Sequence, residues 1–506
     1  MDTALEDKEE PCHALETISN NDGEVLMKPR FTYWTLLGYQ IMVMASWSNY
    51  LITIGVAVDV GGPVGFLYGT LVVGFFQQLT VFAISELASA WPHPGGPMFW
   101  TTKLAPEKYG PAVSFFMGWI TVLAYTAPLA SAGFSSSQVL SALITQIYGY
   151  EWTRWQLCFL YWGIALTCLP VSLRPKWMPA WSAISLVCFL GTMIATIALW
   201  ASHIEPQSAE FVFKEFSNNT GWKNDGFVFL LSLIQTSYAM SGLEAATHMS
   251  FETKNPRRTV PQVLISSVII STLLCFGFAI LLLYALGPLD DLIGSSLGAI
   301  YLQLYVNAAG EAAGLGFASF VMFLLNLLCG TQLLAAGARV VWSLARMGCI
   351  PYAQTFEIID ARSGAPIYAT LLTLVLSMLF GLLYIASETA WNAIVSCTVT
   401  AFEICYIGPL IILLIRGRSI LPARYLNLDK IPYLGFIINL VTVLWGLLII
   451  VVSLFPVYMP VGAETMNYTA VVIAACALLL FPYWFFSAKY SLKQDVLEAD
   501  MMLIVT

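Results

Sequence analysis

Long apolar runs recur along most of the chain, and short polar segments separate them. Each run approaches the length of about 20 mostly apolar residues that a helix needs to cross the hydrocarbon core of a bilayer. Twelve such runs lie at residues 33–58, 64–88, 112–140, 155–173, 177–201, 226–249, 263–286, 316–344, 367–386, 390–415, 434–455 and 468–488. The pattern predicts twelve transmembrane helices within residues 32–488, flanked by an acidic, disordered tail at residues 1–31 and a short tail at residues 489–506.

The composition supports this prediction. Of the 506 residues, 58% are hydrophobic and only 10% are charged, whereas soluble domains average about 25% charged residues. We therefore expect an all-α polytopic membrane protein. The first thirty residues do not combine a basic start with an apolar stretch, so no signal peptide is predicted.

Motifs that would indicate catalysis or metal binding are not found in the sequence. Nearly all of the ten cysteines lie within the apolar runs, which is typical of buried thiols. The chain contains no CxxC, HExxH, P-loop or GxSxG pattern, and its four histidines are scattered. We expect no enzyme activity, no metal, no cofactor and no nucleic-acid partner.

The distribution of basic residues predicts the orientation in the membrane. With the N-terminus inside, only Arg154, Lys214 and Lys223 of the 22 Lys and Arg residues fall in outer loops, which leaves 19 for the tails and inner loops. Such an excess marks the cytosolic side. Two Asn-X-Thr sequons, at Asn218 and Asn467, fall in outer loops and are candidate glycosylation sites. Both termini are therefore predicted to be cytosolic.

Three ionisable side chains lie deep within predicted spans: Glu244 and His248 in the sixth, and Glu403 in the tenth. Because a charge at the bilayer centre costs at least about 2.5 kcal/mol, such residues usually face a cavity or a partner. Each is a candidate proton carrier, and a structural ion pair or interhelical hydrogen bond is the alternative for Glu244. Glu86 and Arg339 lie closer to the inner helix ends, where we expect them to snorkel towards water.

Small and polar residues interrupt the first and the sixth span. In the sixth, Ser241 and Gly242 form a plausible helix break, and a half-helix starting there would direct free N–H groups into the membrane centre. In the first, residues 46–49 read Ser-Trp-Ser-Asn. These positions are equivalent in two five-helix halves, and paired interruptions of this kind indicate a transporter's binding site. Polar side chains that only join helices are the alternative.

Three further stretches resemble a known family. They are "ISELASAWPHPGGPMFWTTKLAPEKYGP" after the second span, "AMSGLEAATHMSFETKNPRRTVP" in the sixth and "AGARVVWSLARMGCIP" at the end of the eighth. In this order and on these spans, they resemble the amino acid–polyamine–organocation permeases, and particularly the fungal amino acid/choline transporter branch. The resemblance extends from about residue 32 to residue 487.

The resemblance implies a LeuT-like fold of two inverted five-helix repeats plus two C-terminal helices, with substrate held between the broken first and sixth helices. Carried over by position, it implies substrate-binding roles for Ser46, Trp47, Ser48, Asn49, Tyr238, Ser241, Gly242 and Glu244, and more loosely for Tyr125, Asn326 and Thr331. The chain departs from many relatives because its first interruption lacks the Gly-rich run that holds an amino acid's carboxylate.

An acidic residue and aromatic rings without this Gly-rich run favour a cationic amine as substrate. We expect a secondary active transporter of an amino acid or small amine such as choline, γ-aminobutyrate, a polyamine or an alkaloid-like amine. A proton is the expected coupling ion, with sodium as the alternative, and the plasma membrane is the expected location, with an internal membrane as the alternative. Two other hypotheses are a transporter of a secondary metabolite or its precursor, associated with a fungal biosynthetic gene cluster, and a non-transporting amino-acid sensor.

Overall fold

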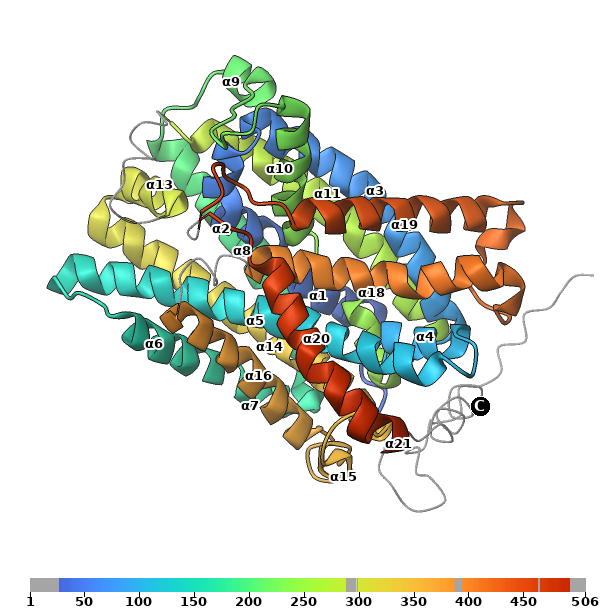
Figure 1. Cartoon of the computed structure of the whole chain (residues 1–506). Coiled ribbons are helices and arrows are strands. Elements are labelled where there is room, and N and C mark those ends of the chain that lie inside the picture. The colour runs from blue at the N-terminus through green and yellow to red at the C-terminus, as the bar shows by residue number, and fades with distance from the viewer. Residues whose placement is uncertain (1–26, 288–296, 298, 387–393, 463–464, 492–506) are drawn as a thin grey trace, which may run out of the picture.

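The computed structural model describes residues 27–287, 297, 299–386, 394–462 and 465–491 (Figure 1). This part of the chain is helical, with two isolated β-bridges and no named strand. Eleven of its helices are long and apolar enough to cross a membrane. The prediction of an all-helical polytopic membrane protein is therefore confirmed. The predicted sixth span is not among the eleven, because it is split into two short helices.

The long apolar runs define the helices closely. The helices that coincide with predicted spans are α1 (Tyr33–Met44) with α2 (Ser46–Asp59), α3 (Gly62–Ala90), α5 (Gly110–Tyr148), α6 (Arg154–Leu166) with α7 (Leu169–Ser172), α8 (Met178–His203), α10 (Asp225–Ala239) with the 3₁₀ helix η2 (Ala245–Glu252), α11 (Pro256–Ala285), α14 (Glu311–Arg346), α16 (Ile367–Ala386), α18 (Ile394–Arg416), α19 (Leu434–Ser453) and α20 (Thr469–Tyr483). Residues 390–393 of the predicted tenth span lie outside the described residues.

Short helices occupy the connections. They are α4 (Pro97–Leu104), η1 (Pro175–Trp177), α9 (Ala209–Lys214), α13 (Ile300–Ala309), α15 (Ala353–Phe356), η3 (Arg418–Ile420), η4 (Leu428–Lys430), the π-helical turn η5 (Trp484–Ala488) and α21 (Lys489–Ser491). Figure 1 places α9 and α15 at opposite ends of the bundle.

The core of the bundle is built around α5 and α14, which pack along each other. Small residues allow close approach, since a Cβ at Gly337 of α14 would lie 3.4 Å from the Cβ of Tyr125 of α5. By contrast, α20 crosses the outside of the bundle in Figure 1, and only 6% of its most apolar window is buried. Its apolar side chains are therefore suited to contact lipid rather than a protein core.

Glu86 and Arg339 do not snorkel towards water, so this prediction was wrong. Arg339 is fully buried, and its Nη2 lies 2.7 Å from Oε1 of Glu252 at the end of η2. The Glu86 carboxylate binds Arg418 and Arg424, at 2.5 and 2.8 Å. The partners come from segments far away in the sequence, and an ion pair removes the need to reach water.

The described end of the predicted N-terminal tail packs against the bundle. The N–H groups of Arg30 and Phe31 donate to the carbonyl oxygen of Glu252, at 2.6 and 2.8 Å. Phe31 is completely buried and forms a parallel bridge with Thr253. Residues 1–26 and 492–506 of the predicted tails lie outside the described residues.

Candidate functional site

The first predicted span breaks at Ala45. This residue has φ 43° and ψ 36°, a left-handed conformation that separates α1 from α2 and that non-glycine residues seldom adopt. The side chains that follow satisfy carbonyl groups at the break: Ser48 Oγ donates to the Ala45 oxygen at 2.8 Å, and Asn49 Nδ2 donates to the Met44 oxygen at 3.0 Å. The polar residues of the first interruption therefore stabilise the break itself.

The sixth predicted span breaks at Gly242, which has φ +83°. Gln40 of α1 bridges the break, because its Nε2 donates to the Gly242 oxygen and its Oε1 accepts from the Ala246 N–H, both at 2.7 Å. The Tyr406 hydroxyl accepts from the N–H groups of Gly242 and Leu243, both at 2.9 Å. The expectation of free N–H groups on a new α-helix is thus wrong: side chains occupy these donors, and the following segment is a 3₁₀ helix.

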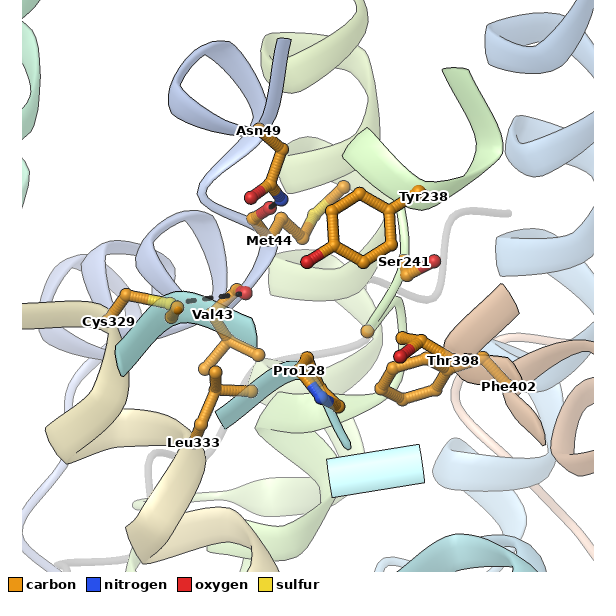
Figure 2. Close-up of a pocket in the computed structure, with 12 residues that line it drawn as sticks. Val43, Met44, Asn49, Pro128, Tyr238, Ser241, Cys329, Leu333, Thr398 and Phe402 are labelled. Atoms are coloured by element: carbon orange, nitrogen blue, oxygen red, sulfur yellow. Dashed lines mark hydrogen bonds between the residues drawn. The ribbon is translucent and has the colours of Figure 1, made fainter. Parts of the chain in front are cut away.

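A partly open pocket lies between the two breaks, and its about 370 Å³ of empty space includes space open to solvent. Residues of α1, α2, α5, α10, α14 and α18 contribute to it (Figure 2). The lining residues are Val43, Met44 and Asn49 at the first break, Tyr238, Ser241 and Gly242 at the second, Pro128 and Ala132 of α5, Cys329 and Leu333 of α14, and Thr398 and Phe402 of α18.

The lining is largely apolar, with a few polar groups. Figure 2 shows Asn49, Tyr238 and Ser241 towards one end of the pocket, and Leu333 and Phe402 towards the other. The Tyr238 hydroxyl donates to Ser131 Oγ at 3.0 Å, which fixes its ring. No carboxylate or basic side chain is among the lining residues that the structure describes.

Only part of the predicted site lines this pocket: Asn49, Tyr238, Ser241 and Gly242. Trp47 lies elsewhere, since its Nε1 donates to the Phe189 oxygen at 3.1 Å and its ring packs against Phe189 and Phe278. The remaining predicted residues outside the lining are Ser46, Ser48, Tyr125, Glu244, Asn326 and Thr331. Of these, Asn326 is buried, and neither polar atom of its amide has a hydrogen-bond partner among the described residues.

Glu244 lies behind the pocket lining, in a cluster with Tyr125 and His248. The Tyr125 hydroxyl donates to Glu244 Oε1 at 3.1 Å. The Tyr125 ring lies 5.4 Å from that of Phe402, a lining residue, and 4.9 Å from that of His248. His248 Nε2 lies 3.8 Å from Glu244 Oε1. A single aromatic layer thus connects this cluster to the pocket.

Glu403 occupies a separate position between α3, α18 and α19. Its Oε1 accepts a hydrogen bond from Gln77 Nε2 at 2.8 Å, and its Oε2 has no hydrogen-bond partner among the described residues. A Cβ at Gly446 would lie 3.1 Å from this oxygen, so the carboxylate is packed tightly on that side.

The two sequons lie in loops that touch each other. The Met459 N–H donates to the Thr220 oxygen at 2.7 Å, which joins the loop after α19 to the loop before α10. Both sequon amides are engaged: Asn218 Nδ2 donates to Asp225 Oδ1 at 2.8 Å, and Asn467 Nδ2 donates to the Ser453 oxygen at 2.7 Å. Within the described residues, no group of three or more His, Cys, Asp or Glu side chains could hold a metal ion.

Sequence reasoning missed several residues that build the site. Gln40 is a single polar residue in an apolar run, and this signal could have identified it. Tyr406, Phe402 and Cys329 carry no such signal, because Tyr, Phe and Cys are common in the spans of this chain.

The fold and the pocket define a multi-pass membrane protein with a largely apolar pocket between two broken helices. The sequence profile described as amino acid permease matches residues 31–476. A choline transporter of Saccharomyces cerevisiae is 30% identical over 478 residues, which span 92% of this chain and 83% of the relative. A swainsonine transporter, swnT, of Arthroderma benhamiae is 28% identical and covers 92% of both chains. Amino-acid permease BAT1 of Arabidopsis thaliana is 26% identical, over 85% of this chain and 86% of the relative.

The chain belongs to the amino acid permease family, within the amino acid–polyamine–organocation superfamily. The resemblance seen in the sequence motifs is confirmed.

Proposed function

We propose that this protein is a secondary active transporter of an amino acid or small amine, and that the pocket between the two breaks is its substrate site. The observation that carries the proposal is the pocket between breaks at Ala45 and Gly242, in a chain of this family. Broken helices let a transporter expose one site to either side of the membrane in turn. The names of the yeast and Arthroderma relatives, which refer to choline and swainsonine, support an amine as the substrate.

The pocket chemistry favours a cation over an anion. Carboxylates are commonly bound by free N–H groups at helix ends, but Tyr406 and Gln40 occupy those of Gly242, Leu243 and Ala246. The rings of Tyr238 and Phe402 both line the pocket. An aromatic face attracts a cation by about 0.5–2 kcal/mol. A small amine with a bulky apolar body therefore fits best.

For the membrane arrangement we propose twelve spans, with α1–α2 as the first and α10–η2 as the sixth. Two inverted five-helix repeats and two C-terminal helices would then form residues 32–488, with both tails in the cytosol and Asn218 and Asn467 outside as glycosylation sites. The contact between the two sequon loops supports placing them on one side. We propose the plasma membrane as the location, with an internal membrane as the alternative.

For the driving force we propose proton symport, with Glu244, His248 and Glu403 as candidate carriers. Their burial within the membrane region supports this role, because an ionisable side chain there usually marks an ion or proton pathway. Sodium is the alternative coupling ion.

Uptake by the purified protein in lipid vesicles tests the proposed function. The panel contains choline, γ-aminobutyrate, a polyamine, a bicyclic alkaloid amine and neutral amino acids, each with and without an inward proton gradient. We expect uptake of an amine, enhanced by the gradient. Uptake of the alkaloid amine alone would favour a transporter of a secondary metabolite, a role that the swainsonine relative supports. Binding without uptake by folded protein would contradict transport and favour a sensor.

A further inference from the structure

We propose that Glu244 and His248 form a buried acid–base pair that holds one exchangeable proton during transport. This inference rests on the proposed function and assigns its proton site to the pair rather than to Glu403. Both side chains are completely buried. Glu244 Oε2 and His248 Nε2 have no hydrogen-bond partner among the described residues.

The contact between His248 and the loop before α4 fixes the tautomer of the imidazole. His248 Nδ1 lies 2.6 Å from the Pro94 oxygen. A carbonyl oxygen can only accept, so Nδ1 carries the hydrogen and donates it. In the neutral ring, Nε2 is then a bare lone pair, and it is this atom that faces Glu244. A side chain at Gly96 would collide with the ring, because its Cβ would lie 3.0 Å from His248 Cε1.

The distance between the two groups indicates that they do not share a hydrogen. His248 Nε2 and Glu244 Oε1 are 3.8 Å apart, beyond hydrogen-bond distance. An ionised carboxylate and a neutral imidazole in this tautomer present two acceptors to each other, and no hydrogen lies between them. One added proton converts this contact into a hydrogen bond, either from the carboxylic acid to Nε2 or from the imidazolium to the carboxylate.

The groups around the pair do not compete with it for the proton. Arg339 and Glu252, the nearest full charges along η2 and α14, already bind each other at 2.7 Å. The other titratable groups that interact with Glu244 are Tyr125 of α5 and Cys405 and Tyr406 of α18. His93 of the loop before α4 packs against Phe99 and Phe251 instead, and its Nδ1 accepts from the Gly95 N–H at 2.9 Å. Tyr125 donates to Glu244 and Tyr406 accepts from the backbone, so neither supplies a basic atom to compete with His248.

The position of the pair links the proton to the substrate. Tyr125 holds Glu244 and lies against Phe402, which lines the pocket. The pair also belongs to the segment that begins at Gly242, a lining residue of the same break. Binding of a proton would therefore change the charge directly behind the pocket without displacing the substrate.

The test compares two readouts for each variant in vesicles: exchange of labelled substrate without a gradient, and accumulation driven by an inward proton gradient. For Glu244→Gln we expect gradient-driven accumulation, taken relative to the variant's own exchange rate, to fall at least ten-fold below the wild type. For His248→Gln the side-chain amide can donate to Glu244 and favours its ionised form, so the pH of half-maximal uptake should fall. Glu210→Gln and His203→Gln, which replace exposed residues in α9 and at the end of α8, are the matched controls.

The outcomes distinguish a failure of the proposed function from a failure of the proposed Glu244–His248 pair. If the wild type does not exchange substrate, the proposed function fails. If it exchanges substrate but Glu244→Gln still accumulates it with the gradient, the pair is overturned and the proposed function stands. Loss of accumulation in Glu403→Gln but not in Glu244→Gln would also overturn the pair. A melting temperature measured for each variant identifies misfolding, and Glu244→Asp, which keeps the acid, should retain partial accumulation.

Discussion

The guanidinium of Arg339 lies 2.7 Å from the carboxylate of Glu252, and both side chains are buried. This ion pair joins the segment after the sixth-span break to α14, one of the two central helices. Arg30 approaches the same carboxylate, at 3.7 Å, from the chain that precedes α1. Three segments that are far apart in the sequence therefore meet at one acid.

Removing one member of this pair should destabilise the protein strongly. Arg339→Met leaves Glu252 buried without its main partner, and an unpaired buried charge costs about 3–5 kcal/mol. We expect a large fall in the melting temperature of the purified protein and a partial recovery in Arg339→Met/Glu252→Gln. The matched control is Lys214→Met, which breaks an exposed pair with Glu210 that should contribute at most about 1 kcal/mol. Equal melting temperatures for the two single variants would contradict this prediction.

Tyr406 should affect substrate binding through the shape of the break. Tyr406→Phe removes the acceptor for the N–H groups of Gly242 and Leu243, and each unsatisfied buried donor costs about 1–3 kcal/mol. We expect the KM for uptake to rise at least ten-fold. Tyr50→Phe is the control, since it also removes a buried hydroxyl, which is bonded to Thr70 at 2.7 Å. The prediction fails if both variants raise KM equally.

The network at the α18–α19 connection should weaken in acid. Burial raises the pKa of the Asp429 carboxyl, but hydrogen bonds and charges from Arg418 and Arg424 lower it by more, so the net pKa is depressed. A depressed folded-state pKa contributes stability above the pKa of an unfolded Asp, about 3.9, and this contribution is lost as the pH falls through the folded-state value.

The measurement is the difference in melting temperature between the wild type and Asp429→Asn at pH values from 7 down to 3. We expect the wild type to be more stable at pH 7 and the difference to shrink as the pH falls below about 4. A difference that stays constant over this range would show that the Asp429 charge does not contribute.

The sequence was sufficient to predict the helices, because membrane spans depend on local composition. The apolar run at residues 367–386 coincides with α16, and the break predicted at Ser241 and Gly242 lies where the backbone takes φ +83°. The number of twelve spans stays a prediction, since the sixth run does not form one continuous helix.

The partners of polar residues could not be predicted, because they depend on contacts between distant segments. Gln40 bonds to Gly242, which is 202 positions away, and nothing in the local sequence indicates this. Trp47 illustrates a second limit. Its direction depends on the left-handed backbone at Ala45, which places the ring against Phe189 rather than in the pocket.

The central claim is that substrate is carried in the space between the two breaks. Ala132 lines this space and lies on α5, so Ala132→Phe would place an aromatic ring at the pocket lining. Ala142 lies on the same helix, is equally only partly buried and does not line the pocket, which makes Ala142→Phe the matched control.

The most direct measurement is uptake of the amine identified in the vesicle assay by these two variants, with the melting temperature of each recorded. We predict that Ala132→Phe melts close to the wild type yet loses at least ten-fold in uptake, whereas Ala142→Phe transports normally. Normal uptake by folded Ala132→Phe would show that substrate does not pass through this pocket.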